Sequence, residues 1–273
     1  MYVDVHSHLT HDDFAADLPD VIARAEKSGL TAIVVNGLEP ASNQRILELA
    51  AQYPVIKPAL GIYPIDAVND IVDNLPFPIR KFHVPDAIAG IRREVAAGRA
   101  FAIGECGLDG YWVGEETFAA QEKVFEELIG IALEFDKPLI IHTRKREERA
   151  MQILAAHGVK RVDFHCYGGK SKLALRAAEQ HGWYFSIPAN ARNNESFRKL
   201  LKELPQDLVL TETDCPYLAP VRGERNEPAN VVGTVKLMAE LRNWSEDQAR
   251  EQIWTNYKRL FQVGSDPDGE AKA

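Results

Sequence analysis

The chain has 273 residues and a formal charge of 32 − 40 = −8, with 45% apolar and 26% charged residues. This composition excludes a disordered chain, a collagen-like fibre and a small domain held together by disulfides. The acidic balance disfavours a protein that coats duplex DNA by charge alone, because such domains are usually basic.

The start of the chain and its cysteines indicate the compartment. No apolar run approaches the roughly 20 residues that a membrane helix needs. The first residues, Met1–His6, lack the basic and apolar regions of a signal peptide. Cys106, Cys166 and Cys215 are odd in number and widely spaced, which indicates reduced thiols. We therefore expect a cytoplasmic protein with no membrane partner.

Short β-branched runs alternate with longer stretches rich in Ala, Leu, Glu, Lys and Arg. In chain order, the short runs predict strands at Val3–His6, Ala32–Val35, Val55–Leu60, Phe101–Gly104, Leu139–His142, Val162–His165, Trp183–Ile187 and Leu208–Thr211. The longer stretches predict helices at Asp17–Ser28, Ser42–Gln52, Asp86–Ala97, Glu115–Phe135, Arg146–Ala156, Ser171–Gln180, Asn194–Glu203, Pro228–Leu241 and Ser245–Phe261.

Repetition of strand and helix predicts an α/β fold with a parallel sheet and right-handed crossovers. Eight such units favour a closed (β/α)8 TIM barrel, which typically takes about 250 residues, as a single domain at 1–263. A doubly wound open sheet is the alternative, although no glycine-rich dinucleotide fingerprint or phosphate loop follows any strand. The small, polar tail at 264–273 is expected to be disordered.

Residues 65–90 interrupt the alternation of strands and helices between the third and fourth predicted strands. The segment carries Pro76, Pro78 and Pro85 and the basic pair Arg80 and Lys81. Two interpretations stay open: a surface excursion, or a flap over the site, since barrel loops often shape access to substrate.

Polar side chains alternate along the first predicted strand, at Asp4, His6 and His8. Period two places all three on one face, which is the lumen in a barrel. Two imidazoles at i and i+2 can converge on one cation, with Asp4 as a support below them. Taken alone, a His-x-His pair is a weak signal and more often structural.

Four later strands end in the same kind of side chain: Glu105, His142, His165 and Asp214. The C-terminal exits of parallel barrel strands cluster on one rim, where active sites are found. A satisfied core histidine explains one such position but not five, because buried polar groups need partners. The sequence therefore predicts a metal site.

The number of candidate ligands exceeds what one closed site needs. Two divalent ions about 3.5–4 Å apart that share a bridging carboxylate would account for all of these ligands. Mixed nitrogen and oxygen ligands suit Zn²⁺, Mn²⁺ or Fe²⁺ more than Ca²⁺ and would hold Mg²⁺ less tightly. We expect two divalent ions, with Mg²⁺, Mn²⁺ and Zn²⁺ as the ones to test.

Several motifs occur in a fixed order: Asp4–Leu9, Ile103–Asp109, Ile141–Arg144, His165–Gly168, Glu212–Leu218, Asn226–Asn230 and Thr255–Phe261. Together they resemble the TatD-related metal-dependent deoxyribonucleases, a branch of the amidohydrolase-like barrels, over nearly the whole chain. The resemblance implies that His6, His8 and Asp214 hold one ion, that His142 and His165 hold the second, and that Glu105 bridges them. It also implies hydrolysis of DNA phosphodiester bonds from a chain end.

One position departs from that family. After the third strand the family usually has Gly-x-His-Pro, whereas this chain has Gly61-Ile62-Tyr63-Pro64. Tyr63 would either contact substrate or pack against segment 65–90. Arg144, two positions beyond His142, would either fork onto a substrate phosphate or stand exposed at the start of the next helix.

We expect metal-assisted hydrolysis with Asp214 as the general base, acting on single-stranded DNA or chain ends and without a protein partner. An alternative is a hydrolase of the same barrel class for a small amide, lactone or phosphoester, favoured by the charge of −8 and by Tyr63. A third reading is a metal-dependent scaffold without catalysis.

Overall fold

The structure is a computed structural model that describes residues 1–73 and 75–264. Its strands form one parallel sheet in the order β1 to β8. The strands are β1 (Tyr2–Ser7), β2 (Leu30–Asn36), β3 (Ile56–Leu60), β4 (Ala102–Asp109), β5 (Leu139–Arg144), β6 (Val162–Phe164), β7 (Tyr184–Ile187) and β8 (Val209–Thr211). Each overlaps one predicted strand, so the prediction of an eight-stranded barrel is confirmed and the open doubly wound alternative is wrong.

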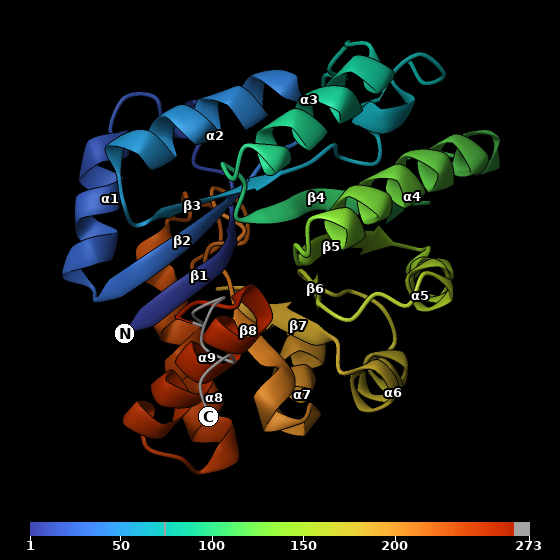
Figure 1. The fold of residues 1–273 in the computed structure, drawn as a ribbon. Helices are drawn as coiled ribbons and strands as arrows, with labels where there is room; N and C mark the ends of the chain where they lie inside the picture. Colours follow the sequence, from blue (N-terminus) through green and yellow to red (C-terminus); the bar gives the residue numbers. More distant parts are fainter. Residues whose placement is uncertain (74, 265–273) are drawn as a thin grey trace, which may run out of the picture.

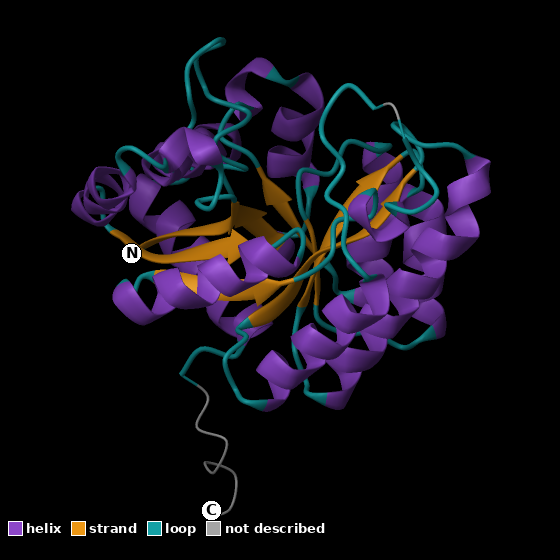
Figure 2. Ribbon diagram, turned by 90° about the horizontal axis from the view of Figure 1, so that it is seen from above, coloured by secondary structure: helices purple, strands orange, loops and turns teal. Residues whose placement is uncertain are grey.

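Helices follow the strands and surround them, as Figures 1 and 2 show. The α-helices are α1 (Leu18–Lys27), α2 (Pro40–Gln52), α3 (Val84–Ala96), α4 (Phe118–Glu134), α5 (Glu147–Ala156), α6 (Ser171–His181), α7 (Glu195–Glu203), α8 (Val231–Arg242) and α9 (Glu246–Phe261). Short 3-10 helices lie at Asp12–Phe14, Asp66–Val68, Glu115–Thr117, Ala191–Asn193, Gln206–Leu208 and Pro228–Asn230.

Local sequence explains where several helices begin and end. Helix α9 begins with a capping box, in which Ser245 accepts from the Gln248 main chain and Gln248 accepts in return. Helix α2 begins with the corresponding pair Glu39 and Ser42. Helix α6 ends at His181 and is capped by Gly182, whose φ of 70° suits glycine. The strands are almost wholly buried, because helices cover their outer face and the side chains that fill the barrel cover their inner face.

The barrel closes between β1 and β8 through bonds at and beyond the strand ends. The main-chain nitrogen of Asp214 donates to the His6 oxygen, and that of His8 donates to the Cys215 oxygen, both at 2.9 Å. The Asp4 carboxylate accepts from the Thr213 nitrogen at 2.9 Å and from its hydroxyl at 2.5 Å. These bonds fix the segment after β8 against β1, and so bring Asp214 beside His6 and His8.

Segment 65–90 packs into a small apolar cluster of its own. Ile65, Val68 and Val72 are buried with Val113, and Phe77 packs edge-on against Trp112 at 5.1 Å between ring centres. The main chain and guanidinium of Arg80 donate to the Asp66 carboxylate at 3.0 and 2.7 Å. The segment is thus held against the loop after β4, beside the rim, and is more than a loose surface excursion.

Two further expectations concern the ends and surface of the chain. Of the tail predicted to be disordered, 264–273, all but Gly264 lies outside the described residues. Among the residues that are described, no helix combines the length and apolar character that crossing a bilayer requires.

Candidate metal centre

The six side chains predicted as metal ligands meet at the C-terminal end of the barrel. His6 lies on β1 and His8 just beyond it, Glu105 on β4 and His142 on β5, His165 directly after β6, and Asp214 three residues after β8. The carboxylate of Asp214 is 14% exposed, and the other five side chains are more deeply buried. Residues up to 208 positions apart in the chain are therefore neighbours in space.

Glu105 stands at the centre, with one oxygen toward each pair of imidazoles. Its Oε2 lies 3.4 Å from the Nε2 atoms of both His6 and His8. Its Oε1 lies 2.9 Å from Nδ1 of His142 and 3.3 Å from Nε2 of His165. This is the arrangement that a bridging carboxylate between two ions would need.

Asp214 faces the first of these pairs. Its Oδ1 lies 3.6 Å from Nε2 of His6 and 3.4 Å from Nε2 of His8. The two Nε2 atoms are themselves only 3.1 Å apart. Three side chains thus point at one small volume, and their contacts differ from those of His142 and His165.

Glycines let the main chain of β4 approach its neighbours closely. A Cβ added to Gly61, after β3, would lie 2.4 Å from the carbonyl carbon of Gly104 and 2.5 Å from the nitrogen of Glu105. Gly107 has a φ of 140°, and a Cβ there would lie 2.1 Å from the His142 oxygen. Both positions require glycine: Gly61 lets the main chain after β3 approach Glu105, and Gly107 lets β4 approach His142 on β5.

The charges of the site follow from burial and these contacts. Burial disfavours the charged carboxylate of Glu105, but the imidazoles of His165, His142 and His6 outweigh it and hold its pKa well below the usual range. Burial, with His165 nearby, lowers the pKa of His6 to about 3. An ionised carboxylate beside a neutral imidazole is the protonation state that metal binding requires.

Asp109 is a functional residue that the sequence reasoning did not assign. Its Oδ2 lies 3.0 Å from Nε2 of His142, the ring nitrogen that does not face Glu105. Its Oδ1 accepts from the main-chain nitrogens of Tyr111 and Trp112, both at 2.8 Å. A carboxylate on the remote nitrogen of a ligand histidine fixes its tautomer and orientation. The feature of the sequence that could have identified Asp109 is its position two residues beyond Gly107, in a buried strand.

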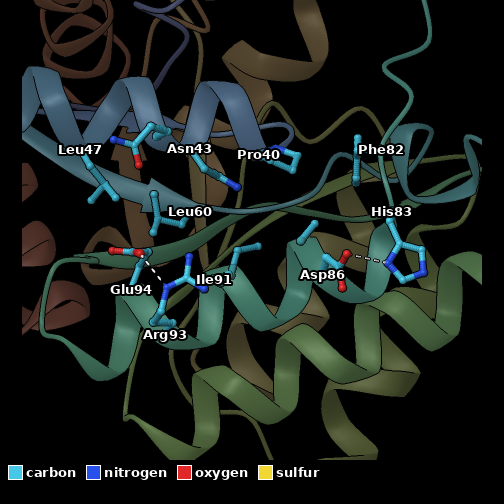
Figure 3. Close-up of a pocket in the computed structure, with 13 residues that line it drawn as sticks. Pro40, Asn43, Leu47, Leu60, Phe82, His83, Asp86, Ile91, Arg93 and Glu94 are labelled. Carbon is cyan, nitrogen blue, oxygen red and sulfur yellow. Dashed lines mark hydrogen bonds and ion pairs between the residues drawn. The ribbon is translucent and has the colours of Figure 1, made fainter.

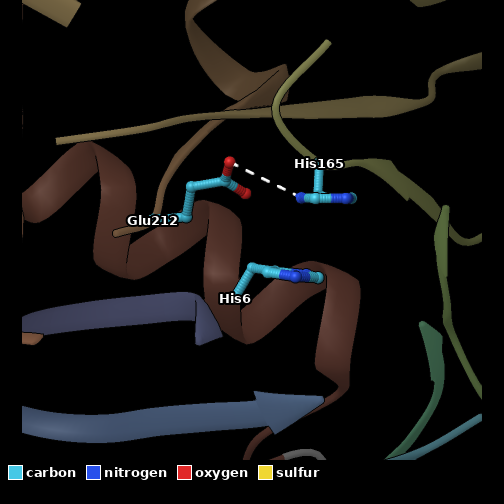
Figure 4. A group of neighbouring side chains, drawn as sticks. All are labelled: His6, His165 and Glu212. Atoms are coloured by element: carbon cyan, nitrogen blue, oxygen red, sulfur yellow. Dashed lines mark ion pairs between the residues drawn. The ribbon is translucent and has the colours of Figure 1, made fainter. Parts of the chain in front are cut away.

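Glu212 is the second such residue, and Figure 4 shows it beside His6 and His165. Its Oε1 lies 3.8 Å from Nδ1 of His165, and its Oε2 accepts from the Ser186 hydroxyl. The same hydroxyl lies 2.8 Å from Oδ2 of Asp163. A buried polar chain therefore runs beneath His165. The signal for Glu212 was its position two residues before Asp214, on the same face.

Asp4 does not join the ligands. Its oxygens are occupied by Thr213, as described above, and by the His6 nitrogen at 3.3 Å. It supports the centre indirectly, by tying β1 to the segment that carries Asp214.

The two predicted substrate contacts lie at the rim. The Tyr63 ring is half-buried, with its centre 5.0 Å from that of His142, and burial raises the pKa of its hydroxyl. It also packs against the apolar cluster of segment 65–90. Arg144 is exposed, and its guanidinium carbon lies 5.8 Å from the centre of the Tyr111 ring. Trp112 packs edge-on against Tyr111 of its own loop and against Phe77 of segment 65–90.

The side chains present fit a metal centre. Among the residues described, 1–73 and 75–264, three overlapping triads have ligand atoms within 4.8 Å of one another: His6, His8 and Glu105; Glu105, His142 and His165; His6, His165 and Glu212. Nδ1 of His165 and Oε1 of Glu212 are buried and have no hydrogen-bond partner in the described part of the chain. Imidazoles gathered around shared carboxylates form a donor set of the kind that divalent metals take.

A separate pocket of about 290 Å³ lies in the outer layer between α2 and α3, shown in Figure 3. Leu47 and Ile91 form part of its apolar wall, and Asp86 pairs with His83 at 3.0 Å at one end. Its lining comes mainly from α2 and α3 and includes none of the six predicted metal ligands, so it is distinct from the candidate metal centre.

Comparisons with known proteins agree with this geometry. A family model described as TatD related DNase matches residues 3–262. YabD of Bacillus subtilis, an uncharacterized metal-dependent hydrolase, is 33% identical over 269 residues, which cover 96% of this chain and 100% of that protein. The 3′-5′ ssDNA/RNA exonuclease TatD of Edwardsiella piscicida is 28% identical over 273 residues, covering 96% and 99%.

Solved structures show the same fold. The TatD homologue YjjV of Escherichia coli K12 superposes with a TM-score of 0.83 at 23% identity, covering 96% of this chain and 98% of that one. The eight-stranded barrel is thus shared along almost the full length of both chains.

Proposed function

The chain belongs to the TatD-related DNase family, and from that premise we propose that it is a divalent-metal-dependent deoxyribonuclease. It would hydrolyse phosphodiester bonds in single-stranded DNA or at DNA chain ends. One observation carries the proposal: a single buried carboxylate, Glu105, presents one oxygen to His6 and His8 and the other to His142 and His165. The name of the relative from Edwardsiella piscicida supports a nucleic acid as substrate.

Two groups of side chains would hold the ions. His6, His8 and Asp214 would take one and His142 and His165 the other, with Glu105 shared between them. Two divalent ions, when bound, would lower the pKa of water and balance the charge that develops on the phosphoryl oxygens.

The remaining chemistry belongs to the chain itself. Burial opposes ionisation of Asp214, but His8, His165 and His6 outweigh it and keep its pKa below the usual range. An ionised carboxylate with 14% of its surface open can accept the proton of an attacking water. Arg144 stands exposed at the rim and would pair with a phosphate oxygen, while Tyr63 would border the substrate beside His142.

The direct test is hydrolysis of single-stranded DNA labelled at its 5′ end. The metal-free protein is supplied with Mg²⁺, Mn²⁺ or Zn²⁺ in separate reactions, and the products are separated by size. We expect a ladder of successively shorter strands with at least one of the ions. An intact strand with all three ions would overturn the proposal.

A second candidate function is supported by the net charge of −8 and by Tyr63, whose ring narrows the space beside His142. It is hydrolysis of a small amide, lactone or phosphoester at the same centre. Turnover of such an ester together with intact DNA in the assay above would favour it.

A further inference from the structure

Two aromatic rings stand exposed at the mouth of the barrel. The Phe, Trp and Tyr side chains of the chain all fall within the described residues, and only Tyr111 and Tyr217 among them are exposed, at 57% and 52%. Tyr111 lies in the loop after β4 and Tyr217 in the loop after β8, so both belong to the rim that carries the candidate metal centre. Exposed tyrosines are typical of binding surfaces, because they join an apolar ring to a polar hydroxyl.

The Tyr217 ring stands beside the group formed by His6, His8 and Asp214. Its centre lies 6.3 Å from that of His8 and 5.6 Å from that of His11, with the rings edge-on in both pairs. The main-chain nitrogen of Tyr217 donates to the main-chain oxygen of Asp214 at 3.0 Å. The ring is therefore held close to one side of the candidate metal centre, with about half of the residue's surface open.

The Tyr111 ring stands beside the other group, formed by His142 and His165. Its main-chain nitrogen donates to the Asp109 carboxylate at 2.8 Å, and that carboxylate also contacts Nε2 of His142. The guanidinium carbon of Arg144 lies 5.8 Å from the Tyr111 ring centre. A base on the ring and a phosphate on Arg144 can therefore belong to the same stretch of a bound strand.

The two rings lie on opposite sides of the mouth. Tyr111 belongs to the side of β4 and β5, and Tyr217 to the side of β8 and β1, because hydrogen bonds hold the segment after β8 against β1. In a closed barrel of eight strands in the order β1 to β8, these two pairs of strands face each other across the axis. A nucleic-acid strand that crosses the mouth therefore meets one ring, then the candidate metal centre, and then the other ring.

We propose that Tyr111 and Tyr217 are two stacking platforms, each of which takes one unpaired base, on either side of the phosphate at the metal centre. The inference rests on the proposed function. Single-stranded nucleic acids bind by stacking bases on exposed aromatic rings, and every base can stack because each has a π-face. The bases of a duplex are already paired and stacked, so their faces are closed to the rings. The platforms thus select single strands without reading the identity of the base.

The first test measures binding of single-stranded and duplex DNA to the metal-loaded protein by fluorescence anisotropy, with phosphorothioate backbones that resist hydrolysis. We expect Tyr111→Ala and Tyr217→Ala each to weaken binding of the single strand at least fivefold, which is the lower end of what stacking one base contributes. Binding of the duplex should weaken less than twofold. A loss below fivefold for the single strand, or the same loss for the duplex, would overturn the inference.

Conservative and distant variants control for structural effects. Tyr111→Phe and Tyr217→Phe keep the ring and should bind the single strand within twofold of the parent. Leu133→Ala removes an exposed apolar side chain near the end of α4, which leads into β5 from the opposite end of the barrel, and should also stay within twofold. Both alanine variants keep the main-chain nitrogens that donate to Asp109 and Asp214, so their bound metal should match that of the parent by elemental analysis. Loss of metal would overturn the role of that ring as a platform.

The second test pairs each ring with one nucleotide. The substrates carry a tetrahydrofuran abasic residue in place of the nucleotide 5′ or 3′ of the scissile bond, and kcat/KM is compared between the parent and the two alanine variants. Each variant should lose nothing further on one of these substrates, because the base that stacks on the missing ring is already absent, and should show its full loss on the other. Full losses for both variants on both substrates would overturn the pairing of bases with rings.

These tests separate the inference from the proposed function. Intact DNA, together with binding that prefers single strands and depends on both rings, would overturn the nuclease proposal and leave the platforms standing. Cleavage of single-stranded DNA that neither alanine variant slows would overturn the platforms alone.

Discussion

Asp109→Asn isolates the contribution of one buried carboxylate to the candidate metal centre. The new amide oxygen still accepts from the nitrogens of Tyr111 and Trp112, so the loop after β4 keeps both bonds. The contact with His142 is lost, because an amide NH₂ in place of Oδ2 cannot accept from the ring nitrogen. The change therefore removes a single interaction without emptying space.

The expected magnitude follows from that contact. The two partners are buried and 3.0 Å apart, and a hydrogen bond to a charged group contributes about 1.5–3 kcal/mol. That range corresponds to roughly 10- to 150-fold in affinity, and loss of such a supporting partner typically weakens metal binding by about 10- to 100-fold. Only the ion held by His142 and His165 should weaken, since Asp109 contacts neither His6 nor His8.

The assay is a calorimetric titration of the metal-free protein with Zn²⁺, which resolves strong and weakened sites. Asp66→Asn is the control, because Asp66 is also a buried carboxylate that accepts from a main-chain nitrogen and a side chain, but its partner is Arg80. Its metal affinities should stay within twofold of the parent. If Asp109→Asn also binds both ions within twofold of the parent, then Asp109 does not orient His142 or His142 is not a ligand.

Three other changes test the remaining assignments. Glu105→Gln should lower activity more than about a hundredfold and reduce bound metal below two ions per chain, with circular dichroism unchanged, because no carboxylate is left to bridge; full activity would refute the bridging role. Arg144→Ala should raise the KM for DNA about tenfold through loss of a charge-assisted bond, and metal loss by elemental analysis would show that the residue is misassigned. Burial, with Glu212 nearby, raises the pKa of Asp163 to about 8. Between about pH 4 and pH 8 the folded metal-free protein then holds a proton on Asp163 that the unfolded chain lacks. The contribution of Asp163 to the free energy of unfolding is therefore complete below about pH 4. It is lost as the pH rises toward 8, by up to about 1.4 kcal/mol per pH unit. Urea unfolding at pH 5, 6 and 7 should show this slope in the parent and a smaller one in Asp163→Asn; equal slopes would contradict it.

The strand positions could be predicted because periodicity is a local property of the chain. Each predicted strand overlaps an observed one, and β5, predicted at Leu139–His142, continues only to Arg144. The largest difference is β4, predicted to end at Gly104 but extending to Asp109. Glycines at 104 and 107 break the β-branched pattern, yet the close approach of neighbouring main chains requires them. Local propensity and tertiary packing disagree at this strand, which is the one that carries Glu105.

The sequence by itself determined which residues face the lumen at the strand exits, because alternation along a strand decides the side to which each side chain points. It therefore indicated His6, His8, Glu105, His142, His165 and Asp214 as a group. It could not assign Asp109 to His142 or Glu212 to His165. Those pairings depend on the register between strands, on closure of β8 against β1 and on the course of the rim loops, which only the folded chain fixes.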